Sequence, residues 1–273
     1  TTVIRGEDHI SNTPRQIHIQ NALGYPELEY AHLPLVLGSD KKRLSKRHAA
    51  TSLEEYKDEG YLDSAILNTL ARLGWSRGDK EVFYLEDLIK DFDITEVQKA
   101  GAIFDVTKLD FLNSQHMANL SHEEFINAIN PFLIDVDINL NEHIKKDLLI
   151  ESMRSSSNTL KGVCNNLICY FKDVEEYNQK AIDKFIGNSD KVLSDLRNKI
   201  NDLKTWDESS LDTLLQKYRE EHDLPIPKVN QPIRIALTGS TNSPSLGTTL
   251  YLFDKEEVLN RLDALISFLH KDN

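Results

Sequence analysis

The sequence has 273 residues, of which 40% are hydrophobic and 28% charged, the composition of a soluble globular protein long enough for two domains. Its net charge of −12 argues against diffuse binding of nucleic acid, which needs a broadly basic surface, but leaves room for local basic patches. No run approaches the roughly 18 apolar residues that span a bilayer, so we expect a cytoplasmic protein without membrane contact.

The first forty residues predict part of an α/β domain. The β-branched run TTVIRG indicates a strand, and because the chain opens inside it without an initiator Met, we expect the first residues of a longer protein to be missing. A helix should follow, with Thr13 as its cap, Pro14 in its first turn and Gly24 at its end. The apolar run YAHLPLVLG, closed by Gly38, indicates a second strand, and this order favours a parallel sheet.

The densest run of positive charge, KKRLSKRHAATS at residues 41–52, follows this second strand. Its basic residues are Lys41, Lys42, Arg43, Lys46 and Arg47, with Ser45 among them. An ammonium and a hydroxyl on a loop flanked by guanidinium groups can hold a polyphosphate and follow the charge that develops on a leaving pyrophosphate. From composition alone, a solvated basic loop or a localisation signal remains the simpler explanation.

From residue 62 onward the sequence becomes helical. The segment LDSAILNTLARLGW places Ile66, Leu70 and Leu73 on one face, with Asp63 as the cap and Gly74 as the stop. Capping boxes are predicted before three later helices, at Ser121 with Glu124, Thr205 with Glu208, and Asp254 with Glu257. A stripe of Val258, Leu262, Leu265 and Leu269 marks the last helix.

No convincing strand occurs between about Leu112 and Lys228, so the carboxyl-terminal part is predicted to be all-α. The two cysteines, Cys164 and Cys169, lie in one of its helices, about 140° apart around the axis. Neither a disulfide nor a pair of metal ligands suits that placement, and no His stands at zinc-ligand spacing. We expect buried, reduced thiols and no zinc site.

Several motifs occur in order along the chain: IRGEDHISNTPRQ, HLPLVLGSDKKRLSKRHAATSLEEYKDEGYL, LARLGWS, FDVTKLDFLN and QPIRIALTGSTNSPSLGTTLYLFDKEEVLNRL. Together they resemble bacterial glutamyl-tRNA synthetase, a class I aminoacyl-tRNA synthetase, over nearly the whole chain. The resemblance implies the second half of a Rossmann-type catalytic domain at 1–60, a helical stem-contact segment at 61–115 and an all-helical anticodon-binding domain at 116–273. Whether that last domain divides into two subdomains is left open.

The resemblance implies the two-step ligation of glutamate to tRNA(Glu). ATP, with Mg²⁺, activates L-glutamate to glutamyl-adenylate, and the terminal ribose hydroxyl of the tRNA then takes the glutamyl group. RLSKR stands at the K-M-S-K-S-type signature, so Lys46 and Ser45 are the expected catalytic residues, and Arg43, Lys46 and Arg47 the expected ATP-binding ones. Arg43 replaces the Lys that relatives often carry, and Leu44 matches an apolar anchor.

Two residues of IRGEDH match family positions near the bound glutamate. Arg5, at the end of a strand, can pair with a carboxylate, although an ion pair with Glu7 or Asp8 is the alternative. His9, with Asn12, matches the same block, and either ligand contact or loop support explains it.

The resemblance places the anticodon-binding residues in the last 120 residues. Arg234, Ser243, Pro244 and Leu246 lie in a stretch that we predict to be loop-rich, where Arg234 and Ser243 would hydrogen-bond base edges and Pro244 and Leu246 would stack on bases. A plain helix–helix connection is the alternative.

Two departures from the family pattern carry expectations of their own. In MRSSSNTLK, where discriminating relatives tend to have an arginine, the chain offers Arg154 as an anticodon-binding residue, followed by three serines at 155–157. If Ser156 occupies the reading position, we expect relaxed reading of the third anticodon base. The family's H-I-G-H-type ATP signature is not in the sequence. We therefore expect these 273 residues to be inactive alone.

Three other readings compete with a monomeric synthetase. The first is a non-catalytic tRNA-binding module, against which stands RLSKR, since a pure binder has no need of a phosphate-binding loop. The second is the related glutaminyl enzyme, whose anticodon part is β-rich, whereas this chain is helical from Leu112 onward. The third is a helical scaffold, which does not explain the α/β opening.

Overall fold

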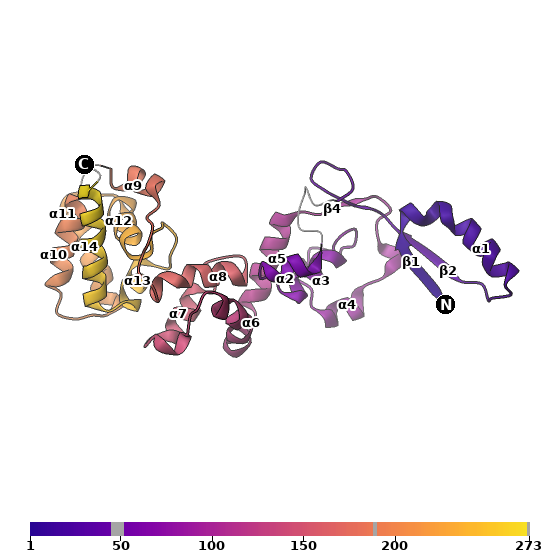
Figure 1. Ribbon diagram of the computed structural model, residues 1–273, viewed down its shortest axis with the longest axis horizontal. Coiled ribbons are helices and arrows are strands. Elements are labelled where there is room, and N and C mark those ends of the chain that lie inside the picture. The colour runs from indigo at the N-terminus through magenta and orange to yellow at the C-terminus, as the bar shows by residue number, and fades with distance from the viewer. Residues whose placement is uncertain (45–51, 188–189, 272–273) are drawn as a thin grey trace. The chain divides into compact units, whose positions relative to one another are not determined.

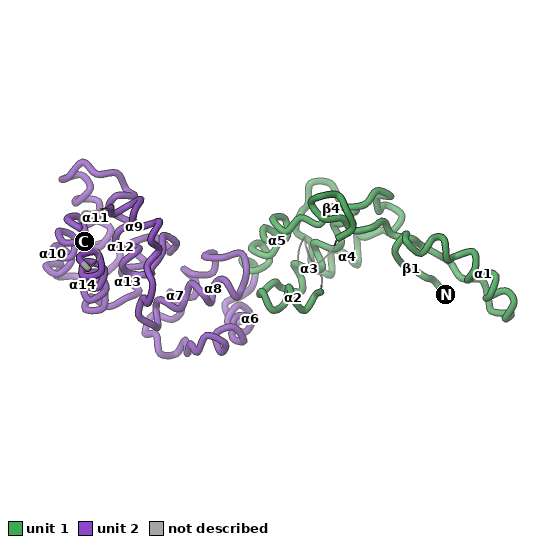
Figure 2. The backbone as a smooth tube through the Cα atoms, turned by 45° about the horizontal axis from the view of Figure 1, so that its top comes forward, with its two compact units in different colours: residues 1–119 green, residues 120–273 purple. Residues whose placement is uncertain are grey.

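The computed structural model describes residues 1–44, 52–187 and 190–271. The chain forms two compact units, residues 1–119 and residues 120–273 (Figure 2). All strands that the structure describes lie before Phe104, and the described part of the second unit is helical. An α/β piece followed by an all-α domain is thereby confirmed. The finer division into 1–60, 61–115 and 116–273 stays a prediction.

Unit 1 opens with the predicted strand, helix and strand (Figure 1). The strands β1 (Thr2–Gly6) and β2 (Glu29–Leu33) pair in parallel, and a 3-10 helix, η1 (Glu7–Asn12), and α1 (Thr13–Ala22) connect them. The prediction of Thr13 as the cap is wrong, because Thr13 is already helical and Asn12 occupies the cap position.

Pro34 divides the predicted second strand. β2 ends at Leu33, and β3 (Val36–Leu37) pairs in parallel with β4 (Ala102–Ile103) in a separate sheet. Proline has no N–H to donate to a strand ladder, so the ladder beside β1 cannot continue through it. Two small sheets therefore replace the single one expected.

The remainder of unit 1 is helical. Its elements are α2 (Leu53–Asp58), α3 (Asp63–Ala71), α4 (Leu85–Asp91), η2 (Ile94–Glu96) and α5 (Val106–Ala118). The predicted face of α3 is partly wrong: Ile66 is buried, but Leu70 is 44% exposed. The buried face instead includes Asn68, whose amide oxygen accepts a hydrogen bond from the Phe83 N–H at 2.8 Å. Leu62, not Asp63, is the residue at the cap position.

Unit 2 begins with three α-helices and two 3-10 helices. They are α6 (His122–Asp135), η3 (Leu140–Glu142), α7 (Lys146–Met153), α8 (Leu160–Leu167) and η4 (Ile168–Tyr170). The helices that the structure describes after these are α9 (Gln179–Phe185), α10 (Lys191–Asn201), α11 (Glu208–His222), α12 (Ile226–Thr238), α13 (Leu246–Leu252) and α14 (Lys255–Lys271). In the core, α10 and α12 pack on α14, and α11 packs on α13.

Local capping chemistry explains where several of these helices begin. The predicted box of Ser121 and Glu124 is confirmed at the start of α6, with both reciprocal hydrogen bonds present. Asp254 caps α14 by accepting from the Glu257 N–H at 2.8 Å. The Thr205 prediction is wrong: Asp207 caps α11, because its carboxylate accepts from the Ser210 N–H at 2.7 Å.

The predicted stripe of α14 lies in the core. Val258, Leu262 and Leu265 have no exposed surface, and Leu269 is half-buried. None of the helices that the structure describes is long and apolar enough to cross a membrane.

Candidate functional site

The basic run begins on a tight turn directly after β3. The Gly38 N–H donates to the Lys42 carbonyl at 2.8 Å, and Lys41 adopts a φ of 61°, which reverses the chain. Leu44 packs against the buried cluster around Tyr56, as expected for an anchor. Ser45, Lys46 and Arg47 lie outside the described residues, so their assigned roles stay predictions.

Arg43 is the phosphate-binding candidate that the structure describes. Its guanidinium lies 3.6 Å from the Asp8 carboxylate, and its side chain is 71% exposed. An ion pair this open to water stabilises the fold little, so a polyphosphate can compete for the guanidinium at small cost. The position therefore suits a mobile contact to a phosphate.

Arg5 lies at the end of β1 in a network with Thr13, His32 and Tyr30. Its Nη2 donates to Thr13 Oγ1 at 2.8 Å, and its Nε donates to His32 Nε2 at 3.3 Å. The guanidinium also lies 5.5 Å from the centre of the Tyr30 ring. These contacts fix the direction of the guanidinium while leaving its charge for another group.

The alternative, an ion pair of Arg5 with Glu7 or Asp8, is not what the described residues form. The Glu7 carboxylate accepts from the Leu35 N–H at 3.2 Å, and Asp8 pairs with Arg43. A guanidinium whose neighbours are a hydroxyl, an imidazole and a phenol ring is suited to bind a carboxylate ligand.

His9 belongs to the same network through its backbone. Its carbonyl accepts from Thr13 Oγ1 at 3.2 Å, and its exposed ring lies 3.4 Å from the Asn12 amide nitrogen. His9 thus supports the turn that carries Thr13, while its ring stays open to solvent.

In unit 2, the predicted loop-rich stretch is partly wrong. Gln231–Thr238 belongs to α12, which continues past Pro232, and only residues 239–245 form the connection to α13. Arg234 therefore projects from a helix. Its Nη2 donates to the Pro244 carbonyl at 2.8 Å, and burial lowers the pKa of its guanidinium.

The connection to α13 is held from within. Ser243 Oγ lies 2.9 Å from Thr249 Oγ1, and the Pro244 carbonyl binds Arg234. Leu246 is only 3% exposed and packs in the core, so little of its side chain is free, and its stacking on a base stays a prediction. Ser243 and Pro244 are half-buried, and their contact with RNA stays a prediction.

Arg154 ends α7 and joins it to the start of α6. Its guanidinium donates to the carbonyl of Leu120 at 2.7 Å, lies 3.3 Å from the Glu151 carboxylate, and stands 4.7 Å from the centre of the Phe125 ring. The side chain is 15% exposed. Arg154 thus has a structural task that sequence reasoning did not foresee, and its contact with the anticodon stays a prediction.

A polar pocket of about 200 Å³ lies between α8, η4 and the α12–α13 connection. We call it the asparagine pocket, because Asn165, Asn166 and Asn242 line it, together with Ser240 and Ser243. Sequence reasoning missed these asparagines. Asn is common in turns, and no local pattern distinguishes a lining asparagine from a turn-forming one.

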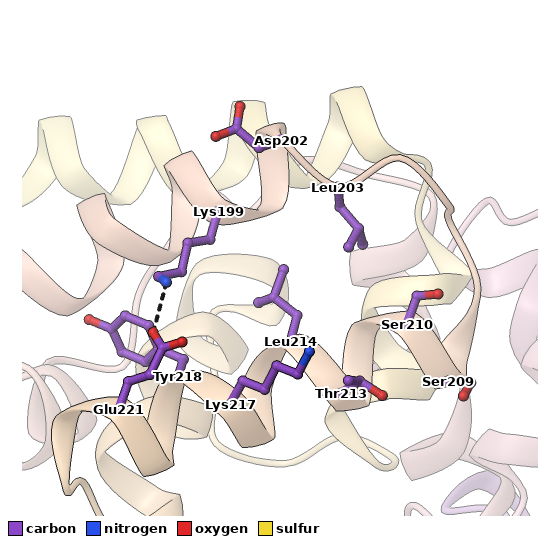
Figure 3. Close-up of a pocket in the computed structure, with 10 residues that line it drawn as sticks. All are labelled: Lys199, Asp202, Leu203, Ser209, Ser210, Thr213, Leu214, Lys217, Tyr218 and Glu221. Carbon is purple, nitrogen blue, oxygen red and sulfur yellow. Dashed lines mark hydrogen bonds and ion pairs between the residues drawn. The ribbon is translucent and has the colours of Figure 1, made fainter.

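A larger groove of about 470 Å³ lies between α10 and α11 (Figure 3). Lys199 pairs with Glu221 at 2.9 Å across it, and Lys217 and Asp202 also line it. Two cations and two carboxylates line the groove, so their charges cancel and do not favour the binding of an anion.

Both cysteines are free. Cys164 is buried and Cys169 half-buried, and burial raises the pKa of each thiol to about 12. Within the described ranges, no three His, Cys, Asp or Glu side chains are grouped so that they could hold a metal ion.

Comparison with known families covers most of the chain. Residues 1–111 match the catalytic domain of class I tRNA synthetases (E and Q), and residues 123–266 match an anticodon binding domain. A glutamate–tRNA ligase of Thermodesulfovibrio yellowstonii is 41% identical over 97% of this chain, and glutamate–tRNA ligase 2 of Halorhodospira halophila is 38% identical over all of it. The chain spans 58% of the length of each.

Solved structures agree with the sequence matches. A glutamate–tRNA ligase of Elizabethkingia meningosepticum in complex with its amino acid superposes with a TM-score of 0.78 at 27% identity, over 98% of this chain and 57% of that one. A glutamate–tRNA synthetase of Elizabethkingia anophelis gives 0.76 at 28% identity. The chain therefore belongs to the class I glutamyl-tRNA synthetase family, whose catalytic domain it matches at residues 1–111 and whose anticodon-binding domain it matches at residues 123–266.

Proposed function

We propose that this chain serves the ligation of glutamate to tRNA(Glu), with unit 1 contributing to the chemistry and unit 2 binding the anticodon. The observation that carries the proposal is the guanidinium of Arg5, which Thr13 and His32 orient and which no carboxylate of the described residues neutralises. A carboxylate substrate suits that position, and it lies in the part of the chain that matches the catalytic domain.

In the proposed reaction, a carboxylate oxygen of glutamate attacks the α-phosphorus of ATP, and pyrophosphate leaves. A ribose hydroxyl of the tRNA end then attacks the acyl carbon, and AMP leaves. Arg5 would hold glutamate with help from the turn at His9. Arg43, Lys46 and Arg47 would bind the phosphates, and Lys46 with Ser45 would stabilise the charge that develops on pyrophosphate.

Mg²⁺ would enter this reaction bound to the phosphates of ATP, the usual way in which this ion reaches a nucleotide site with few protein ligands. We further infer a monomer that works in the cytoplasm, where tRNA is charged. Sedimentation of the purified chain tests the first of these, and a dimer would contradict it.

We infer that residues 1–273 do not form glutamyl-adenylate alone, because no H-I-G-H-type signature is among them. Glutamate-dependent exchange of pyrophosphate into ATP measures this step. No exchange above background is expected, and clear exchange would refute the inference.

A salt series of binding titrations tests the anticodon part. One RNA is tRNA(Glu), and the other is the same tRNA with its anticodon replaced. Replacement should weaken binding at every salt concentration if unit 2 reads the bases, because base contacts do not depend on counterion release. Equal affinities that vanish together as salt rises would mean nonspecific attraction to phosphate, and the anticodon role would be withdrawn.

The alternative function is a tRNA-binding module without catalysis. Arg5 separates the two, since a pure RNA binder has no use for a guanidinium oriented to bind a carboxylate ligand. In a synthetase made complete with the amino-terminal portion of a relative, Arg5→Met should abolish glutamate activation and leave tRNA binding intact. Unchanged activation would favour the alternative.

A further inference from the structure

Two acidic residues directly after β1 connect this strand to the segment around β3. The Glu7 carboxylate accepts a hydrogen bond from the Leu35 N–H at 3.2 Å. The Asp8 carboxylate lies 3.6 Å from the Arg43 guanidinium. Although β1 and β3 belong to separate sheets, this ion pair joins the strand that carries the glutamate candidate to the turn that carries the phosphate candidate.

The backbone at Arg43 is held in place, so only its side chain is free to change partner. Arg43 forms an antiparallel bridge with Leu37 of β3. The next residue, Leu44, donates its N–H to the Val36 carbonyl at 2.9 Å. The Arg43 side chain is 71% exposed, and Asp8 is its ion-pair partner in the described parts of the chain. The guanidinium can therefore turn from one anion to another without any movement of the backbone.

The space beside Gly6 lets the Asp8 carboxylate lie back toward the end of β1. A Cβ atom added at Gly6 would lie 2.5 Å from Asp8 Oδ1, which is too close for two such atoms. The backbone does not require a glycine, since its φ of −67° and ψ of 149° are extended values that any residue adopts. Gly6 thus leaves room for the carboxylate. An alanine there would push away the flexible end of the Asp8 side chain and leave every charge of the chain unchanged.

Asp8 and the phosphates of a nucleotide would compete for the same guanidinium. An exposed pair of single charges changes an equilibrium constant by no more than about fivefold. Pyrophosphate carries several charges and can accept two parallel hydrogen bonds from a guanidinium, so it displaces a single carboxylate. Once the pyrophosphate leaves, the carboxylate is the anion within reach of Arg43. Asp8 is thus placed to lower the affinity of Arg43 for pyrophosphate without abolishing it.

We propose that Asp8 is a positioning residue that competes with phosphate for Arg43. It holds the guanidinium near the end of β1 before the nucleotide binds, and it takes the guanidinium back as pyrophosphate leaves. Asp8 touches none of the reacting atoms and acts only through Arg43. The inference rests on the proposed contact of Arg43 with the phosphates, and adds to it a residue that favours release of the product.

Binding of inorganic pyrophosphate to the full chain tests this competition. Phosphorus NMR follows the titration at about 0.15 M salt, where charges more than about 8 Å apart are largely screened. Asp8→Asn should lower the dissociation constant about two- to fivefold, since the guanidinium loses its competing anion. Gly6→Ala should lower it by a smaller factor, because it moves the carboxylate without removing it. A variant that merely disturbed the fold would bind pyrophosphate more weakly instead.

A matched control and a second background separate this competition from a general effect of charge. Glu27→Gln removes one exposed carboxylate in the connection between α1 and β2, and should leave the dissociation constant nearly unchanged. In an Arg43→Gln chain, Asp8→Asn should no longer strengthen binding. An equal gain from Glu27→Gln, or a gain that persists without Arg43, would overturn the inference.

Failure of the proposed function gives a different result. If Arg43→Gln binds pyrophosphate as tightly as the original chain, Arg43 makes no contact with the phosphates, and the inference is withdrawn together with that contact. If Arg43→Gln weakens binding but Asp8→Asn and Gly6→Ala leave it unchanged, the phosphate contact stands and the competition by Asp8 is refuted.

Discussion

Residues 1–37 and residues 120–273 differ in how they bury apolar side chains. No residue of the first segment is buried, and Ile4, Ile19 and Leu23 are 54%, 61% and 65% exposed. In the second, the leucines of α10, Leu193 and Leu196, are at most 1% exposed. Burial of apolar surface is the main source of stability. The pair of β1 and β2 lacks such burial, so its stability depends on the hydrogen bonds between the strands, whereas that of unit 2 depends on its apolar core. The candidate glutamate residues thus lie on the weakly packed part, and the anticodon candidates on the well-packed one.

Truncation of a core side chain should give the largest effect. Leu196→Ala leaves a cavity in the core of unit 2 and should lower its free energy of unfolding by about 2–5 kcal/mol. Ile4→Ala in β1 removes a side chain that is half in water already, and should cost less than about 1 kcal/mol. Urea unfolding followed by circular dichroism measures both. Similar losses from the two variants would break the comparison.

The two arginines extend the comparison to polar groups. Arg234→Met removes the donor to the Pro244 carbonyl in a half-buried place, and should cost about 1–3 kcal/mol. Arg5→Met loses the hydrogen bonds to Thr13 and His32 near the surface, where water replaces the guanidinium, and should cost less than about 1 kcal/mol. The same urea titrations apply, with Arg15→Met on the exposed face of α1 as the control. A larger loss from Arg5 would contradict the account.

Helix caps give a smaller effect that tests one correction. Asp207→Ala should destabilise unit 2 by about 1 kcal/mol, because the Ser210 N–H loses its acceptor. Thr205→Ala should change the free energy of unfolding by no more than about a few tenths of a kcal/mol, since α11 does not begin there. If the Thr205 variant has the lower free energy of unfolding of the two, the sequence-based assignment of the cap is correct after all.

These cases indicate how far sequence reasoning reaches. Motifs whose parts lie three or four residues apart, such as the box at Ser121, can be predicted because the partners are neighbours in the chain. The Thr205 error has the same origin, since Asp207 offers an equally good cap two residues later.

Burial and long-range contacts were not predictable in this way. Nothing near Leu246 or Arg154 in sequence tells that one lies in the core and that the other binds the Leu120 carbonyl. The asparagine pocket places Asn242 beside Asn165 and Asn166, which are distant in the sequence, so only the folded chain brings its lining together. The family resemblance predicted the architecture because it carries such long-range information from other chains.

The last expected effect is the near absence of reaction at the thiols of unit 2. Burial raises the pKa of Cys164 and Cys169 from 9.0 to about 12, so at pH 8 only about one in ten thousand of these thiols is the reactive thiolate. A disulfide reagent should therefore leave the native chain almost unlabelled at pH 8 and label both cysteines in urea. If one reacts first, it should be the half-buried Cys169.

The same shift has a consequence for stability, and its sign follows from linkage. Because the folded pKa lies above the unfolded one, the thiols contribute fully below about pH 9, and their contribution is lost as pH rises toward 12. The free energy of unfolding should therefore fall between pH 8 and pH 10 by more in the original chain than in a Cys164→Ala, Cys169→Ala double variant. Comparing the two chains cancels the titration of all other groups. An equal fall in both would mean that the two thiols meet water in the folded chain, and that the core of unit 2 is more open than the packing of α8 indicates.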